Sequence, residues 1–155
     1  MYTSLFDIFS IGIGPSSSHT MGPMRAAATF VADLKQQGSL HHTARVHVNL
    51  YGSLALTGEG HGTPGAVVYG LLGLDAETLD LSTDHIGLVQ SGQSLLLGGE
   101  HRIPFTIEQN ISLEYDITLP EHANGMRLRA WNTANELLHE EYFFSIGGGA
   151  IRRRA

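Results

Sequence analysis

Apolar side chains recur every three or four positions along residues 24–34, and this spacing predicts an amphipathic helix. Pro23 fits the first turn of such a helix, where its missing N–H needs no partner. Thr20 is the expected N-cap, with Ser18 as the alternative, because either hydroxyl can accept a hydrogen bond from the first turn. Gly38 is expected just past the C-terminal end, where glycine most easily adopts the left-handed conformation.

The rest of the pattern places short helices mainly in the first half and strands mainly in the second. Residues 44–52 alternate apolar and polar side chains, which is typical of a strand with one exposed face. Thr63 and Pro64 predict a helix from Pro64 to about Leu72, with the Thr63 hydroxyl as its cap. The remaining expected elements are a helical turn after Ser53, a short helix in 82–92, strands in 93–99, 101–107 and 111–119, and a hairpin over 125–146 that turns at 132–135. We therefore predict an α+β fold, in which helices pack on a mixed sheet.

Composition narrows the class of protein. The chain has 155 residues, of which 42% are hydrophobic, so it can form one domain with a substantial core. Its formal net charge of -6 argues against nucleic acid and anionic membrane as partners, since both require a basic face. We find no stretch long enough to span a membrane and no secretory signal, and we expect a cytoplasmic protein. The domain is expected to cover 1–150, and residues 151–155, with Arg152 to Arg154, are expected to form a frayed tail or the start of a linker.

Five polar side chains follow one another in the stretch GIGPSSSHT, directly before the first predicted helix. The N-terminal end of a helix attracts anions, and hydroxyls with an imidazole suit the carboxylate or phosphate of a small polar substrate. A structural cap and loop is the alternative, because serine and threonine are common before helices for that reason alone. The stretch lacks the lysine of a P-loop. Its candidate site residues are Ser16, Ser17, Ser18, His19 and Thr20.

A second candidate is His61, which lies between Gly60 and Gly62 in the stretch GEGHGTP. Glycines on both sides let the backbone approach a ligand closely and leave the imidazole poorly shielded. His61 is therefore a candidate general base. A turn histidine with no chemical role is the alternative.

A third candidate is the stretch PEHANGM, where His122 and Asn124 lie in a loop between two expected strands. Asn124 and Gly125 together form a common tight-turn signal, so a structural turn is the default interpretation. A mobile lid over a site would have the same sequence.

The remaining side chains predict structure rather than a site. Glu140 and Glu141 are expected to be exposed strand carboxylates, and the aromatic residues of the hairpin are expected in the core or an interface. No metal site is expected, because no ligand triad has a recognisable spacing among His41, His42 and His47.

Three stretches, SLFDIFSIGIGPSSSHTMGPMRAA, YGSLALTGEGHGTPGAVVYGLLG and FFSIGGG, together resemble the β domain of the bacterial iron–sulfur L-serine dehydratases. The resemblance runs from about Ser4 to Gly149, which is nearly the whole chain. It implies an enzyme that deaminates L-serine to pyruvate and ammonia with a [4Fe-4S] cluster. It also implies a fold similar to the allosteric substrate-binding domain of phosphoglycerate dehydrogenase.

The resemblance further implies a partner. In the family, the cysteine ligands of the cluster lie in a separate α domain, and the substrate site forms where the α and β domains meet. This chain contains no cysteine, so it cannot hold the cluster. We therefore expect part of a longer enzyme, or a separate β subunit, that is inactive without its α domain.

The resemblance also gives the candidate residues their roles. His61 is expected to remove the Cα proton of L-serine as a general base. His122 and Asn124 are expected to bind the substrate, in a loop that closes over the site. His19 is expected to be the second catalytic residue. It is also expected to bind the substrate carboxylate or line the pocket, together with Ser16, Ser17, Ser18 and Thr20. The alternative is a regulatory serine-binding or dimerisation module without catalytic residues, and a homodimer is the expected assembly.

Overall fold

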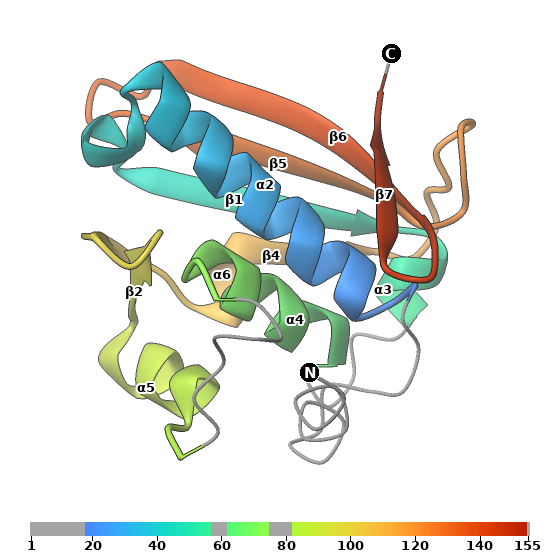
Figure 1. Cartoon of the computed structure of the whole chain (residues 1–155), viewed down its shortest axis with the longest axis horizontal. Coiled ribbons are helices and arrows are strands. Elements are labelled where there is room, and N and C mark those ends of the chain that lie inside the picture. Colours follow the sequence, from blue (N-terminus) through green and yellow to red (C-terminus); the bar gives the residue numbers. More distant parts are fainter. Residues whose placement is uncertain (1–17, 57–61, 75–81, 155) are drawn as a thin grey trace.

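The computed structural model describes residues 18–56, 62–74 and 82–154. In these ranges helices cover one face of a five-stranded sheet, and a separate two-stranded sheet lies beside them (Figure 1). In chain order the elements are α2 (Met21–Gln37), η1 (Leu40–His42), β1 (Arg45–Tyr51), α3 (Ser53–Leu56), α4 (Gly62–Leu71), α5 (His85–Gly92), β2 (Ser94–Leu97), β3 (His101–Pro104), α6 (Ile107–Asn110), β4 (Ile111–Glu114), β5 (Gly125–Trp131), β6 (Leu137–Gly147) and β7 (Ala150–Arg153).

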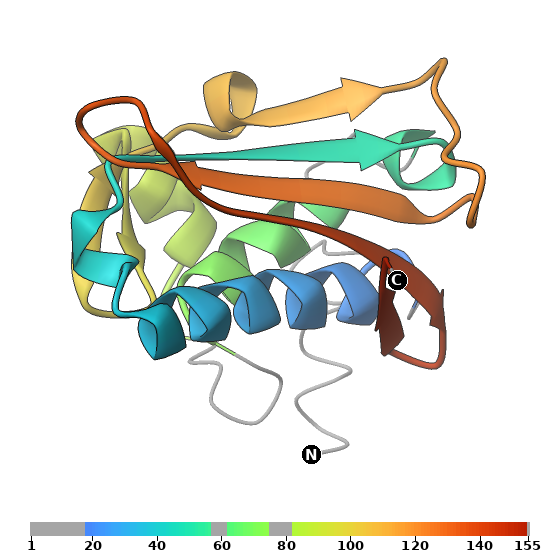
Figure 2. The same ribbon diagram turned by 90° about the horizontal axis from the view of Figure 1, so that it is seen from above.

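The larger sheet has the strand order β4-β1-β5-β6-β7 and is mixed. Strands β1 and β4 pair in parallel, with Val48 opposite Ile111, and the other neighbours pair antiparallel. Figure 2 shows α2 and α4 under the same face of this sheet. The predicted α+β fold, with helices on a mixed sheet, is confirmed.

The apolar core lies between the sheet and these two helices. The alternation of β1 turns Val46, Val48 and Leu50 into the core, where they are fully buried. Helix α2 contributes Phe30 and Leu34 from the opposite side. This burial of two complementary apolar faces is the main stabilising interaction of the fold.

Helix α2 follows its predicted pattern, with Pro23 in the first turn. Gly38 ends the helix in the left-handed conformation, at φ 75°. Thr20 directly precedes the helix, so the predicted N-cap position is confirmed. The predicted hydroxyl cap is wrong, because the buried Thr20 has φ -124° and ψ -62° rather than an extended backbone, and its side chain makes no capping hydrogen bond.

Helix α4 begins at Gly62, earlier than predicted, so Thr63 lies within its first turn and is not the cap. Instead, the Thr63 hydroxyl donates a 2.7 Å hydrogen bond to the backbone carbonyl of His19. A contact between distant segments therefore replaces the local capping bond that the sequence pattern predicts.

Helices α2 and α4 touch through their backbones at Gly70. A Cβ added there would lie 2.3 Å from the carbonyl oxygen of Met24, so only glycine fits this approach. Because Thr63 contacts His19 and Gly70 contacts Met24, the two helices run in the same direction (Figure 1). Their N-terminal ends consequently lie together at one end of the molecule.

The hairpin of β5 and β6 is confirmed, but the predicted frayed tail is wrong for residues 151–153, because β7 spans Ala150–Arg153. This strand pairs antiparallel with β6. The guanidinium of Arg153 also donates hydrogen bonds to Asp33 and Glu141. Pairing with β6 and these two carboxylates holds the strand, and neither interaction is visible in the local sequence.

The strand expected over 101–107 is shorter than predicted, because β3 ends at Pro104 and α6 begins at Ile107. The Thr106 hydroxyl caps this short helix by accepting a 3.1 Å hydrogen bond from the backbone N–H of Gln109.

Within the described ranges, no helix is both long and apolar enough to cross a membrane.

Candidate functional site

His19 and Asn124 are in contact at the end of the sheet where α2 and α4 begin. The Nε2 atom of His19 lies 3.1 Å from the Oδ1 atom of Asn124. His19 belongs to the turn before α2, and Asn124 directly precedes β5. Both residues are half-buried. The structure thus brings together two candidate residues from loops that are far apart in the sequence.

Asn124 is held in place by hydrogen bonds to two further residues. Its backbone N–H donates to the Nδ1 atom of His122 over 2.9 Å, so His122 joins the same cluster. Its side-chain Nδ2 donates to the carbonyl of Ser145 over 3.3 Å. Its own carbonyl accepts a 3.0 Å hydrogen bond from the backbone N–H of Ser145. The side chain of Asn124 therefore has a defined orientation toward His19.

The loop that carries His122 and Asn124 is bonded to the end of β1. The backbone N–H of Gly52 donates to the carbonyl of Ile117 over 2.8 Å, and that of Ser53 donates to the carbonyl of Ala123 over 3.1 Å. Gly52 has φ 52°, and a Cβ there would lie 2.8 Å from the Ala123 carbonyl oxygen. These contacts fix the shape of the loop, and closure over a site stays a prediction.

The N-terminal ends of α2 and α4 flank this cluster. The first turn of a helix leaves backbone N–H groups without helical partners and carries a partial positive charge, so two such ends together favour an anion. In the turn before α2, Ser18 is half-buried and Thr20 is buried. The other candidate residues, Ser16, Ser17 and His61, lie outside the described residues.

Ser145 is a site contact that no sequence motif marks. It is only 2% exposed, and its hydroxyl lies where a Cβ on Gly22 would be, at 2.0 Å. The first turn of α2 therefore approaches β6 closely at Gly22. Among the described residues, the Ser145 hydroxyl has no hydrogen-bond partner. The only sequence signal for Ser145 is its place in the stretch FFSIGGG.

Comparison with known proteins supplies the family. The family model described as serine dehydratase beta chain matches residues 4–155. The chain belongs to this family. It is 44% identical to the L-serine dehydratase of Streptomyces coelicolor, over 97% of this chain and 34% of that protein. It is 46% identical to L-serine dehydratase TdcG of Escherichia coli, over 96% of this chain and 33% of that protein. The chain thus spans about a third of the length of these curated relatives.

The residues of this chain do not fit an iron–sulfur cluster. Such clusters are held mainly by cysteine thiolates, and the sequence has none. In the described residues, one group of three possible ligands, Asp33, His139 and Glu141, has its ligand atoms within 4.8 Å of one another. These are nitrogen and oxygen donors, and the Arg153 guanidinium already binds both carboxylates.

The charges around β7 attach this strand to the rest of the domain. Burial alone would raise the pKa of the Asp33 carboxyl, but hydrogen bonds from Arg153 and His139 outweigh it and lower the pKa below its ordinary value. A hydrogen bond from Arg154 lowers the pKa of Glu121, which lies beside His122 in the sequence. The end of β7 is therefore tied to the loop that forms one side of the cluster.

The histidines near β1 have separate partners. His41 bonds Glu100 over 3.1 Å, and His47 bonds the Ser112 hydroxyl over 2.7 Å. Burial and the nearby guanidinium of Arg129 lower the pKa of His47, so it is neutral at physiological pH.

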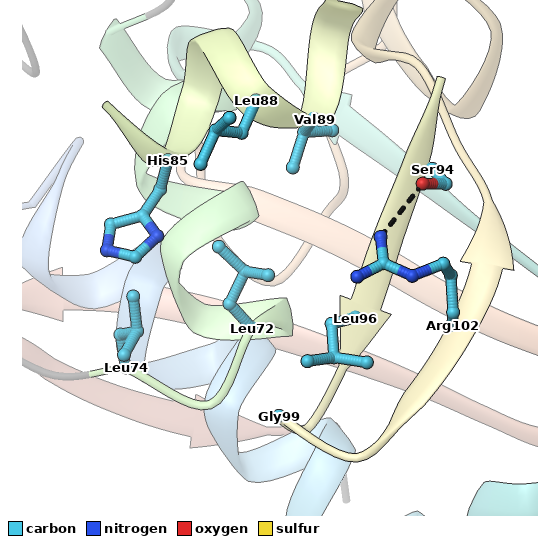
Figure 3. Close-up of a pocket in the computed structure, with 9 residues that line it drawn as sticks. All are labelled: Leu72, Leu74, His85, Leu88, Val89, Ser94, Leu96, Gly99 and Arg102. Atoms are coloured by element: carbon cyan, nitrogen blue, oxygen red, sulfur yellow. Dashed lines mark hydrogen bonds between the residues drawn. The ribbon is translucent and has the colours of Figure 1, made fainter. Parts of the chain in front are cut away.

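A cavity of about 290 Å³ lies apart from the cluster, between α5, the end of α4 and the sheet of β2 and β3 (Figure 3). Four of its nine lining residues are leucines, and His85 and Arg102 supply polar groups, with Arg102 bonded to the Ser94 hydroxyl. None of the candidate site residues that the structure describes lines this cavity. The described candidate residues therefore lie together at the junction of α2, α4 and the loop before β5.

Proposed function

We propose that this chain supplies part of the active site of an L-serine dehydratase, at the end where α2 and α4 begin. The contact between His19 and Asn124 carries the proposal, because it joins two of the loops that the sequence singles out. The relatives from Streptomyces coelicolor and Escherichia coli carry the name L-serine dehydratase, which favours L-serine as the substrate of the whole enzyme. Since the chain spans about a third of these relatives, we assign the rest of the site to an α domain, either fused or separate.

Elimination of water from L-serine needs a base for the weakly acidic Cα proton. We assign that base to His61, acting as a neutral imidazole. The Cα proton passes to His61, the Cβ–O bond breaks, and the hydroxyl leaves as water once it has gained a proton. The product, 2-aminoacrylate, tautomerises to an imine, which water hydrolyses to pyruvate and ammonia.

The substrate carboxylate fits the paired N-terminal ends of α2 and α4. Their first-turn N–H groups and partial positive charge suit an anion. The hydroxyls that enter α2 supply further donors, and His19 presents a second imidazole beside them. His122 and Asn124 bound the site on the side of the loop before β5. The hydroxyls in question belong to Ser16, Ser17, Ser18 and Thr20.

The [4Fe-4S] cluster implied by the resemblance is assigned to cysteines of the α domain, and no step within this chain passes through it. The chain's own contribution is the proton transfer and the binding of the carboxylate. The cytoplasmic location and the homodimer stay predictions.

An assay of pyruvate formation tests the proposal. The isolated chain is expected to form no pyruvate from L-serine, even with iron and sulfide supplied anaerobically. The same chain joined to a cysteine-bearing α domain of the family is expected to turn L-serine over. Pyruvate from the isolated chain would contradict the division of the site. A chain that only changes the cooperativity or KM of an α domain active on its own would favour the regulatory serine-binding or dimerisation module.

A further inference from the structure

We infer that Asn124 is a positioning residue for His19. It holds the proton of the neutral imidazole on Nε2 and leaves Nδ1 as the nitrogen that accepts a proton or a hydrogen bond from the substrate. Although the role of Nδ1 rests on the proposed function, the tautomer is a property of this chain alone.

The first step is the orientation of the Asn124 amide. Its Nδ2 donates to the backbone carbonyl of Ser145 over 3.3 Å. Turning the amide over would place Oδ1 against that carbonyl, and two acceptors cannot bond each other. Oδ1 must therefore face His19, at 3.1 Å from its Nε2 atom.

The second step is the position of the imidazole proton. An amide oxygen only accepts, so the hydrogen bond requires a proton on Nε2 of His19. A neutral imidazole carries one N–H, which leaves a lone pair on Nδ1. Within the described residues, Nδ1 of His19 has no hydrogen-bond partner. Thr63 also fixes the backbone of His19, through the 2.7 Å bond to its carbonyl.

Asn124 itself is poorly suited to bind a substrate. All of its polar atoms already have protein partners, which are His19, His122 and both backbone groups of Ser145. As a neutral amide it also fixes the ring without adding a negative charge, whereas a carboxylate at this position would favour the imidazolium form. Positioning, rather than the substrate binding expected from the sequence, is the role that this geometry supports.

The consequence for His19 is specific. A neutral imidazole with its lone pair on Nδ1 accepts from a donor, such as the ammonium or hydroxyl group of an amino acid. It does not donate from that atom to a carboxylate. The carboxylate is then left to the helix N-termini and the hydroxyls before α2.

Nitrogen-15 NMR of the histidine-labelled chain, at a pH where the imidazoles are neutral, tests the tautomer directly. His19 is expected to show a protonated Nε2 and an unprotonated Nδ1. Asn124→Ala is expected to reduce this preference about fivefold, the equivalent of one neutral hydrogen bond. Asn124→Asp loses the donor to the Ser145 carbonyl but keeps an acceptor oxygen for His19, so it is expected to retain the Nε2–H form. Asn132→Ala removes three side-chain hydrogen bonds in the turn at the far end of the hairpin and is the matched control.

The NMR measurement on the native chain tests the inference even if a variant fails to fold. A proton found on Nδ1 of native His19 would overturn it. In the assembled enzyme, Asn124→Ala is expected to lower kcat with little change in KM. A raised KM with an unaltered His19 tautomer would make Asn124 a substrate ligand and overturn the positioning role. By contrast, full activity of His19→Asn would count against the proposed function and leave the tautomer standing.

Discussion

The Thr63 hydroxyl donates a 2.7 Å hydrogen bond to the backbone carbonyl of His19. This bond joins the first turn of α4 to the turn before α2. Thr63 is fully buried, so water cannot take the place of its hydroxyl. Thr63 also follows the proposed base, His61, by two positions in the sequence. One buried side chain thus connects the two segments that carry the proposed imidazoles.

Thr63→Val is expected to lower the free energy of unfolding by about 1 to 3 kcal/mol, because it removes the donor from a carbonyl shielded from water. Chemical denaturation measures this change. Thr63→Ser keeps the hydroxyl and is the matched control, with a smaller expected loss. A Thr63→Val variant as stable as the native chain would show that the bond contributes nothing.

Gly70→Ala is expected to destabilise the chain by about 1 to 3 kcal/mol, as overpacking does. The new Cβ would lie 2.3 Å from the Met24 carbonyl oxygen, which belongs to the backbone of α2 and cannot move alone. Gly92 is the control, because a Cβ there meets its nearest atom, the Ser94 hydroxyl oxygen, at 3.6 Å. Gly92→Ala is expected to leave the melting temperature unchanged or to raise it, since alanine favours the helix by up to about 1 kcal/mol. Equal melting temperatures for both variants would contradict the close approach of α2 and α4.

Asp33 makes the stability of the chain depend on pH in the acid range. The pKa of its carboxyl is lowered in the folded chain. Its contribution is therefore fully present above the unfolded pKa, about 3.9, and is lost as the pH falls through the folded value. Asp33→Asn is expected to reduce this loss of stability at acid pH. At neutral pH it is expected to lower the free energy of unfolding by about 1 kcal/mol. Denaturation curves across the acid range measure both effects.

Arg153→Gln is also expected to reduce the loss of stability at acid pH, because it removes the guanidinium that lowers the pKa of Asp33. If Asp33→Asn lost stability at acid pH as steeply as the native chain, the bonds of Asp33 with Arg153 and His139 would not stabilise the fold.

The sequence predicts the parts of the fold whose causes are local. The apolar spacing of α2 and the glycine after it depend only on neighbouring residues, and both predictions hold. Thr63 shows the limit, because its hydroxyl could cap α4 or bond a distant carbonyl, and the packing of α4 on α2 selects the second. Likewise, no alternation marks 150–153 as a strand, because β6 and Asp33 hold it in place.

In the candidate site, too, the sequence predicts the local features but not the contacts between distant segments. The hydroxyl-rich loop is conspicuous in the sequence, but the contact between His19 and Asn124 joins residues 105 positions apart, which no local pattern encodes. No sequence motif marks Ser145, because its contribution comes from backbone groups and a close approach to Gly22. Neither feature depends on a recognisable side-chain motif.

The turnover number of the assembled enzyme with His61→Ala tests most directly whether this chain contributes the base. The predicted result is a fall in kcat by two orders of magnitude or more, with little change in KM, as expected for loss of a general base. His42→Ala alters an exposed imidazole in η1, before the start of β1, and is expected to leave kcat unchanged. Native kcat in His61→Ala, with an altered KM or cooperativity, would contradict the catalytic role and favour a regulatory module.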